Sequence, residues 1–326
     1  MANQCNRQST KDVVSHNDSS FIEGCSEYTS ASGSYSCPSN LDRSDKDSHG
    51  KPRTYNIYPN VMMIMRHTER LDDFFPDWIT RCEKGYRPYD LNMPMMLPIR
   101  RPPHAYQGDP PITNTGDILA RIIARGMFSA GYVPDIIYAS PSLRCIQTAN
   151  AMRSILRCEA KIKVEPGLFE NLSLYPNGLP QFASPEERAQ FHVDEKYRPY
   201  MQISDLLRLR ETVPDYNTRI KNTLMRIAKL HEVSSVKKDQ IVLIVAHAST
   251  VDLAGGLLAR SRRSTEADFF ENTKKIPYGS LLVLERVQGR RGWTPNLYAV
   301  PRVTYRDHTT EFDSAFVLRE APKVKK

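Results

Sequence analysis

The sequence predicts an α/β protein built as a three-layer α/β/α domain with a mostly parallel central sheet. Two observations lead to this prediction. Short, continuously apolar segments of strand length recur along the chain, and longer segments with helical periodicity separate them. Strands that are buried on both faces, as in a parallel sheet covered by helices, are expected to be continuously apolar. The 326 residues are enough for one large domain of this kind.

Taken in order, the strands are predicted at 61–65, 135–139, 161–165, 240–246 and 280–287. The predicted helices lie at 115–130, from 140, from about 213 and from 249. Gly131 suits the C-terminal end of the first helix, and Ser140 followed by Pro141 is typical of a helix start. Ser249 and Asp252 have the spacing of a capping box for the last helix. Between the first strand and the first helix, the Pro- and aromatic-rich residues 72–112 predict an irregular excursion.

The chain is predicted to have three parts: a disordered leader at 1–53, a folded domain at 54–318 and a short basic tail at 319–326. The leader contains twelve serines and few apolar residues, so it has little apolar surface with which to offset the entropy of ordering. The chain starts without an apolar signal core, and no apolar run reaches the roughly 18 residues that span a bilayer. We therefore expect a cytoplasmic protein that does not enter a membrane.

The net charge of +8 favours anionic partners. Residues 1–53 carry six basic against seven acidic side chains, so the surplus lies in the remainder of the chain, where it is spread out rather than gathered in one arm. This distribution fits a small anionic group such as phosphate, and we expect no nucleic-acid binding. The six cysteines form no C-x-x-C pair, and no Asp/His cluster suggests a metal, so no cofactor is expected.

Polar side chains follow three of the predicted strands at the point where each strand ends. These are the segments 66–70 (Arg-His-Thr-Glu-Arg), 140–144 (Ser-Pro-Ser-Leu-Arg) and 247–249 (His-Ala-Ser). Ligands of open α/β sheets bind outside the carboxyl ends of the strands. An isolated histidine after a strand is more often structural, but stability alone rarely gathers several arginines at one edge. The pattern therefore predicts an anion-binding site.

These segments, with others in the same order, resemble the histidine phosphatase (phosphoglycerate-mutase-like) superfamily. The similarity is greatest to the phosphatase domain of the suppressor-of-T-cell-receptor-signalling and ecdysteroid-phosphate phosphatase group. It covers about residues 57–286 and rests on the stretches 66–70, 91–94, 111–113, 140–149, 164–170, 197–199, 245–249 and 275–278.

Carried over position by position, the resemblance implies that His67 attacks a phosphomonoester and becomes a covalent phosphohistidine. It implies a phosphate pocket formed by Arg66, Arg70, Arg144 and His247, with Glu170 as the proton donor. The chemistry is consistent, because nearby guanidinium groups keep an imidazole neutral and therefore nucleophilic. Arginine forks also neutralise charge on phosphoryl oxygens.

Three neighbouring residues have competing interpretations. Thr68 stands where the family usually has Gly, so we expect it to strain or narrow the pocket and slow the enzyme, although its hydroxyl is a possible phosphate donor. Glu165 is an alternative to Glu170 as proton donor. Cys145 follows Arg144 but lies on the apolar face of its helix, so it is predicted to be a core residue rather than a nucleophile.

The predicted function is phosphomonoester hydrolysis, with a phosphotyrosyl protein or a small phosphate ester as substrate. Two alternatives remain: a catalytically weak or inactive phosphate-binding scaffold, suggested by Thr68, and a phosphoglycerate-mutase-type phosphoryl transfer. Relatives implied by the resemblance dimerise through this domain, so a homodimer is expected. The stretch 171–213 is expected to form part of the substrate rim, and selectivity is not inferred from it.

Overall fold

The computed structural model of the protein describes residues 60–231, 240–258, 268–286 and 292–304. All of them belong to one unit of the chain, Tyr55–Lys326. The predicted leader at 1–53 and the predicted tail at 319–326 lie outside the described residues.

A six-stranded sheet forms the centre of the domain, with the order β3-β2-β4-β1-β5-β6. Its strands are β1 (Val61–Arg66), β2 (Ile136–Ala139), β3 (Ile162–Val164), β4 (Ile241–Ala246), β5 (Leu281–Glu285) and β6 (Thr294–Pro295). β1, β2, β3 and β4 pair in parallel, whereas β5 runs antiparallel to β1 and β6 antiparallel to β5. The mostly parallel sheet and its five predicted strands are confirmed. The short edge strand β6 was not predicted from the sequence.

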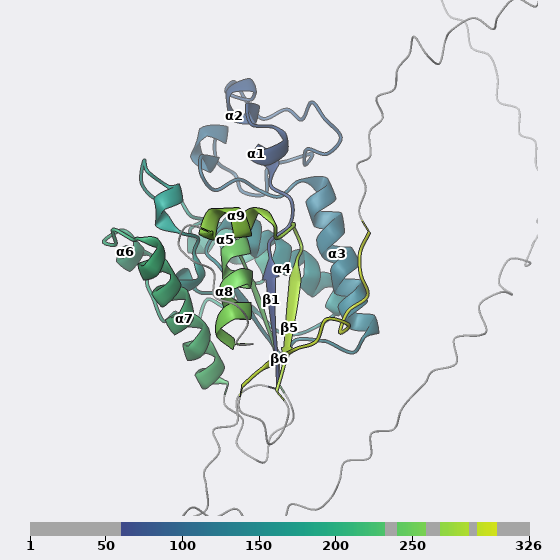
Figure 1. Cartoon of the computed structure of the whole chain (residues 1–326). Coiled ribbons are helices and arrows are strands. Elements are labelled where there is room, and N and C mark those ends of the chain that lie inside the picture. Colours follow the sequence, from purple (N-terminus) through teal and green to yellow (C-terminus); the bar gives the residue numbers. More distant parts are fainter. Residues whose placement is uncertain (1–59, 232–239, 259–267, 287–291, 305–326) are drawn as a thin grey trace, which may run out of the picture. The chain divides into compact units, whose positions relative to one another are not determined.

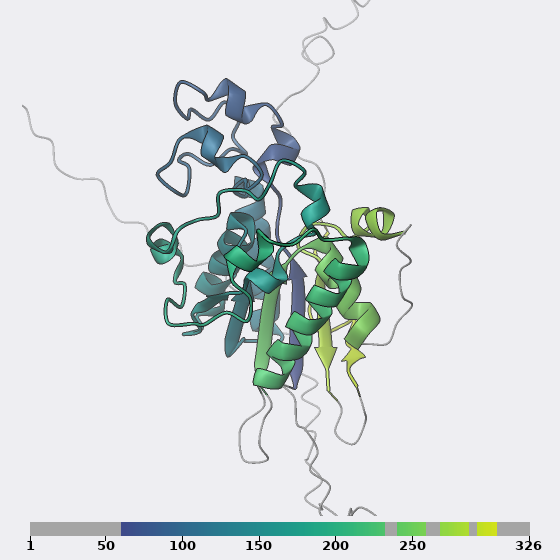
Figure 2. The same ribbon diagram turned by 90° about the vertical axis from the view of Figure 1, so that its left-hand side faces the viewer.

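Helices cover both faces of this sheet. The longer ones are α3 (Asn114–Ser129), α4 (Leu143–Leu156), α7 (Val213–Leu230) and α8 (Ala248–Leu258). Figures 1 and 2 show α3 and α4 on one side of the strands and α7 and α8 on the other. The three-layer α/β/α architecture is therefore confirmed.

The burial of strand β1 on both faces explains why its sequence is continuously apolar. Met63 and Met65 are buried in the cluster that includes residues of α3 and α4. The alternate residues Met62 and Ile64 are buried in a second cluster with residues of α7 and α8. Because successive side chains of a strand point to opposite faces, a strand with a helical layer on each side needs an apolar residue at every position.

Two of the predicted helix starts are wrong. α4 begins at Leu143 with Ser142 in the cap position, so Ser140 and Pro141 precede the helix. α8 begins at Ala248, which places Ser249 inside the first turn, where its hydroxyl bonds to the Tyr216 hydroxyl at 2.6 Å. In both places a Ser that the sequence assigned to a cap has a side-chain partner elsewhere in the fold.

The excursion after β1 is irregular, as predicted. It contains only the short helices α1 (Leu71–Phe74) and α2 (Trp78–Arg81) and the 3₁₀ turn η1 (Pro103–Tyr106). In Figure 1 α1 and α2 lie beyond the end of the sheet where β1 terminates. Trp78 is fully buried there, with its ring edge-on to Tyr106 at 5.8 Å between centroids. Trp78 and Tyr106 belong to the same buried cluster as β1, α3 and α4, so the excursion is anchored to the main core.

The remaining short elements are η2 (Pro166–Leu168), η3 (Leu172–Leu174), α5 (Pro185–Arg188), η4 (Ala189–Phe191), α6 (Ile203–Leu206) and α9 (Phe269–Lys274). No helix of the described ranges is long and apolar enough to cross a membrane.

Candidate active site

The sheet brings the polar segments after β1, β2 and β4 to one edge. Arg66 at the end of β1 is in register with Ala246 at the end of β4, and Ala139 at the end of β2 is in register with Val245. The next residues along the chain are His67, Ser140 and His247. Their side chains therefore meet outside the carboxyl ends of three parallel strands, as the sequence predicts.

His67 is held by its backbone on both sides. Its N–H donates to Ala246 of β4 at 2.9 Å, and its carbonyl accepts from the Gly279 N–H at 3.3 Å. Its ring is also fixed, because Nδ1 lies 2.8 Å from the Thr68 carbonyl oxygen, an acceptor only. Nδ1 therefore carries the ring proton and the Nε2 lone pair faces the site.

The environment keeps this imidazole neutral. His67 is 2% exposed, and this burial, followed by the positive charge of Arg144, holds its pKa well below the usual range. Nε2 accepts from Nε of Arg144 at 3.2 Å. A neutral histidine with an oriented Nε2 has the electronic state that a nitrogen nucleophile requires.

Arg144 is fully buried and is the centre of the site. Besides His67 it contacts Glu170, with 2.8 Å from Nη2 to Oε2, and the Tyr175 hydroxyl, 3.1 Å from the same Nη2. On its far side Nη1 lies 3.6 Å from Oδ1 of the buried Asp109. Its position in the first turn of α4 directs the guanidinium toward the ends of β1 and β4.

Glu170 lies over this guanidinium and is 18% exposed at its side chain. Burial opposes its ionisation, but His247, which is protonated in the acid range where Glu170 titrates, and Arg144 outweigh burial and lower its pKa to about 2. At neutral pH the empty site therefore holds Glu170 as a carboxylate. Its Oε2 occupies a position that an oxygen of a bound oxyanion could take.

His247 is fully buried and neutral. Burial lowers its pKa to about 3 against the opposing effect of the Glu170 carboxylate. Its Nε2 lies 2.9 Å from the Ser140 hydroxyl, and its Nδ1 lies 3.7 Å from Glu170. Ser140, predicted as a helix cap, instead orients this histidine.

Arg66 is the second arginine of the site, and the Glu170 carboxylate is the nearby negative charge that acts most on it. Its guanidinium stacks over the Tyr278 ring, 4.0 Å from the centroid, and Nη1 donates to the Ile276 carbonyl. Tyr278 also lies beside His67, with 5.6 Å between ring centroids, and its hydroxyl donates to Asp73. Among the described residues, the buried Nε of Arg66 and Nη1 of Arg144 have no hydrogen-bond partner. Nη1 of Arg144 lies within ion-pair distance of Asp109, so Nε of Arg66 is the unpaired donor next to Tyr278 and His67.

Arg70 reaches the same edge, but its fork is already occupied. Its Nε and Nη2 donate to the two carboxylate oxygens of Asp72, at 2.9 and 2.6 Å. The structure thus brings Arg66, His67, Arg144, Glu170 and His247 together, while Arg70 contributes its charge from within an ion pair.

The backbone strain expected at Thr68 is not found, and its effect on the rate stays a prediction. Its backbone does not have a positive φ, and its side chain is fully buried. Its hydroxyl and its N–H each lie 3.1 Å from the Thr148 hydroxyl, which itself donates to the Arg144 carbonyl at 2.7 Å. Thr68 therefore ties the loop that carries His67 to the helix that carries Arg144.

Glu69 performs a similar anchoring role in the same loop. Its Oε1 accepts from Asn92 at 2.7 Å and from the Thr113 hydroxyl at 2.6 Å, and Thr113 caps α3 by accepting from the Gly116 N–H. Gly116 permits this approach, because a Cβ there would lie 2.8 Å from the Glu69 carbonyl oxygen. The Asn92 and Thr113 stretches of the predicted motif thus serve to fix the loop.

The two competing interpretations of nearby residues are settled by burial and partners. Glu165 is fully buried and accepts from the Tyr197 hydroxyl and the Tyr200 N–H, each at 2.7 Å, so it is a structural acceptor outside the site. Cys145 is buried in the apolar cluster of α3 and α4, and burial raises its pKa to about 12, as expected for a core thiol.

Sequence reasoning missed Tyr175 and Asp109, which contact Arg144, and gave Tyr278 no role. Tyr278 belongs to the stretch 275–278, on which the resemblance rests, so the sequence could have assigned it a place in the site. Tyr175 and Asp109 lie in irregular segments without periodicity, and nothing local distinguishes them from surface residues.

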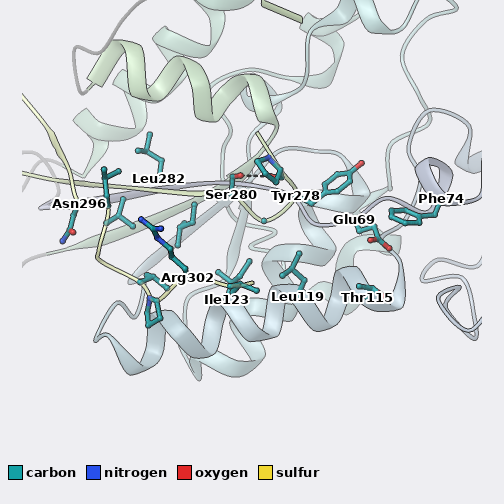
Figure 3. Close-up of a pocket in the computed structure, with 18 residues that line it drawn as sticks. Glu69, Phe74, Thr115, Leu119, Ile123, Tyr278, Ser280, Leu282, Asn296 and Arg302 are labelled. Atoms are coloured by element: carbon teal, nitrogen blue, oxygen red, sulfur yellow. Dashed lines mark hydrogen bonds between the residues drawn. The ribbon is translucent and has the colours of Figure 1, made fainter. Parts of the chain in front are cut away.

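Beside the site lies a pocket of about 520 Å³ between α3, β5 and residues 296–303. Figure 3 shows Leu119 and Ile123 of α3 on one wall, with Tyr278, Glu69 and Phe74 at the end nearest the candidate site. Tyr278 therefore forms part of two walls, one facing His67 and one facing an apolar hollow.

Chemically, the arrangement suits an oxyanion next to a neutral nucleophile. The neutral His67 imidazole lies beside the buried Arg144 guanidinium, and without substrate the Glu170 carboxylate occupies Nη2 of that arginine. Within the described residues, no group of three or more His, Cys, Asp or Glu side chains could hold a metal ion.

Comparisons with known proteins agree with this chemistry. Residues 101–293 match the sequence model of the histidine phosphatase superfamily (branch 1). The match begins after Arg66 and His67, so it does not include the first of the polar segments.

Three relatives extend the similarity. The ecdysteroid-phosphate phosphatase of Drosophila melanogaster is 36% identical over 261 residues, which is 77% of this chain and 32% of that protein. The human ubiquitin-associated and SH3 domain-containing protein B is 36% identical over 228 residues, 67% of this chain and 34% of that protein. The chain thus spans about a third of the length of these curated relatives. A crystal structure of the ecdysone phosphate phosphatase from Bombyx mori, in complex with tungstate, superposes with a TM-score of 0.66 at 28% identity, covering 80% of this chain and all of that one.

Proposed function

Since this chain belongs to the histidine phosphatase superfamily, we propose that it is a phosphomonoesterase in which Nε2 of His67 attacks the phosphorus of its substrate. The observation that carries the proposal is the state of His67. Its proton is on Nδ1, bonded to the Thr68 carbonyl, and its Nε2 lone pair faces the Arg144 guanidinium at 3.2 Å. This places the basic nitrogen of a neutral imidazole next to the buried charge that would bind an anionic substrate.

In the first step the bond from Nε2 to phosphorus forms while the bond from phosphorus to the ester oxygen breaks. Arg66 neutralises charge on the phosphoryl oxygens with its unpaired Nε, and Arg144 does so with Nη2, which Glu170 occupies in the empty site. The proton for the departing oxygen comes from Glu170. The Glu170 carboxylate must first give up its bond to Arg144, which then binds the substrate phosphate. The adjacent phosphate dianion raises the pKa of Glu170, so that the carboxyl group takes up a proton.

In the second step water attacks the phosphohistidine and gives its proton to Glu170, which is now a base. The bond from Nε2 to phosphorus breaks, and inorganic phosphate leaves with His67 neutral again. His247 donates to the phosphoryl oxygens once their charge has raised its pKa, with Ser140 holding the ring from behind.

The substrate class is a phosphotyrosyl protein or a small phosphate ester. Ecdysteroid phosphates enter as candidates because the Drosophila relative is named for them. The apolar pocket beyond Tyr278 has the volume of a small-molecule site, which is compatible with an ester of an apolar alcohol. Assembly as a homodimer stays a prediction, which sedimentation velocity can test.

The test is to incubate the protein with a radiolabelled aryl phosphate, quench without acid and locate the phosphate by mass spectrometry. We expect label on His67, and neither label nor turnover in His67→Ala. Phosphate on Cys145 or on a serine, with His67 unmodified, would end the histidine mechanism.

The two alternatives are separated in the same experiment. An inactive scaffold would bind vanadate or phosphate in equilibrium measurements and show no label. A mutase would pass the label to an added hydroxy-acid acceptor faster than to water. Release of inorganic phosphate at the rate of label turnover supports the phosphatase.

A further inference from the structure

Tyr175 lies in the segment that follows Glu170, a stretch whose sequence suggests only a variable rim. Its ring packs against Phe169, with centroids 5.0 Å apart, and Gly108 lies beside the ring edge. A Cβ built on Gly108 would lie 3.7 Å from the ring, in ordinary contact. The ring thus packs on Phe169, and its hydroxyl lies at the Arg144–Glu170 pair.

That hydroxyl makes two hydrogen bonds within the candidate machinery. It donates to Oε2 of Glu170 at 3.1 Å and accepts from Nη2 of Arg144 at 3.1 Å. The same Nη2 donates to Oε2 at 2.8 Å, so the three groups form a closed triangle. Oε2 of Glu170 has these two donors, whereas Oε1 has no hydrogen bond to either of them.

Substrate binding should affect the two donors to Glu170, Nη2 of Arg144 and the Tyr175 hydroxyl, in different ways. On the proposed function, Arg144 turns its donors to the phosphoryl oxygens, so its bond to Glu170 is lost at the moment when Glu170 must be aimed. Tyr175 has no charge with which to compete for the phosphate. Burial raises its pKa, so the phenol keeps its proton at neutral pH and remains a donor.

We propose that Tyr175 is a positioning residue for general-acid catalysis: its hydroxyl holds Oε2 of Glu170 so that Oε1 carries the proton to the leaving oxygen. The inference rests on the proposed function and adds to it. In the first step the proton moves from Oε1 to the ester oxygen as the phosphorus–oxygen bond breaks. In the second, water returns a proton to Oε1 as its oxygen bonds to phosphorus. Tyr175 keeps its own proton throughout.

The experiment uses Tyr175→Phe, which keeps the ring on Phe169 and removes only the hydroxyl. kcat/KM is measured for aryl phosphates of graded leaving-group pKa and for one alkyl phosphate. A nitrophenolate leaves without protonation, whereas an alkoxide does not, so only the second depends on an aimed acid. We expect a change within about threefold on p-nitrophenyl phosphate and a loss of at least about tenfold on the alkyl ester, the effect of one hydrogen bond to a charged or ionising group.

Two comparisons make the result specific. Glu170→Gln should show the same dependence on the leaving group, and adding Tyr175→Phe to it should cost little more, because both changes disable one function. Tyr132→Phe is the matched control, since its hydroxyl also donates to a glutamate, Glu285, which pairs with Val61 at the end of β1 away from His67, and it should behave as wild type on every substrate.

An equal loss on all leaving groups would mean that Tyr175 is merely structural, and no loss on the alkyl ester would mean that it does not position the acid. Either result overturns the inference and leaves the proposed function intact. If the wild-type protein shows no His67-dependent turnover of any ester, the proposed function fails first, and the positioning role fails with it.

Discussion

Replacing His247 by Gln should make the fold less sensitive to acid. In the folded protein burial lowers the pKa of His247 to about 3, whereas in the unfolded chain the imidazole titrates near 6.5. Between pH 3 and pH 6.5 this histidine is protonated in the unfolded state and neutral in the folded state. The contribution to stability is therefore complete above pH 6.5 and is lost as the pH falls toward 3.

The size of the effect follows from the same pKa difference. Each unit of pH below 6.5 removes about 1.4 kcal/mol, so that one histidine costs about 3 kcal/mol of unfolding free energy on going from pH 7 to pH 4. Gln does not titrate, and its amide is able to bond to the Ser140 hydroxyl that lies 2.9 Å from Nε2. His67 has a lowered pKa too, but it is present in both proteins and its contribution cancels.

The assay is urea unfolding of wild type and His247→Gln at pH 7 and pH 4, with the change in unfolding free energy compared between the two proteins. We expect the loss between the two pH values to be about 3 kcal/mol smaller in the variant, whatever its stability at pH 7. The exposed His104, replaced by Gln, serves as the control and should behave as wild type. Equal losses in His247→Gln and wild type would show that His247 is not buried as a neutral ring, and the electrostatic account of the site would fail.

Three further results are expected. Arg144→Ala should lower kcat/KM by at least about a hundredfold, and Arg144→Lys should recover little, because the fork that reaches His67 and Glu170 is lost; steady-state kinetics within a few-fold of wild type would place it outside the pocket. Thr68→Ser should keep near-normal activity, while Thr68→Gly should lower kcat and reduce the unfolding free energy by about 1 kcal/mol, because it removes the Thr148 contact and frees the loop; a faster Gly variant would restore the steric explanation. Activity should persist in excess EDTA and be inhibited by vanadate, since arginines supply the charge that a metal would otherwise provide; loss on chelation that a divalent cation reverses would contradict this.

The sequence predicted most of the fold because both signals it used are local. A strand buried on both faces must be apolar at every position, and β1 and β4 satisfy this requirement without exception along their central residues. Parallel strands bring their carboxyl ends to one edge, so residues directly after β1 and β4 had to meet there. The convergence of Arg66, His67 and His247 follows from the topology alone.

The errors arise where one residue type suits two partners. Ser140 and Ser249 are good helix caps, but each side chain bonds to a residue of another element, His247 in one case and Tyr216 in the other. Arg70 stays a predicted phosphate ligand, and in the structure its Nε and Nη2 donate to Asp72. Whether such a side chain bonds to a nearby or a distant residue depends on the folded geometry, and helix-capping propensities carry no information about that geometry.

Tyr175 and Asp109 could not have been found in this way, because their importance is defined by Arg144. Asp109 is separated from it by 35 positions and Tyr175 by 31, and both lie in segments without helix or strand periodicity. Asp109 accepts from the Leu143 N–H at 2.8 Å and stands behind the guanidinium; burial, against the opposing charge of Arg144, raises its pKa to about 6. Only the three-dimensional path of the chain brings these groups behind and beside the arginine.

On the proposed mechanism, the charge balance of the empty site is what would let Glu170 serve as acid and then as base. With no substrate, Glu170 bonds to Arg144 and its pKa is about 2, which is unsuited to donating a proton at neutral pH. A phosphate dianion that takes Arg144 removes the interaction that lowered the pKa and adds a negative charge that raises it. On this mechanism, substrate binding raises the pKa of Glu170 and so allows it to act as the general acid. When phosphate has been released, the carboxylate returns to Arg144, and the buried guanidinium is not left without a counter-charge between turnovers.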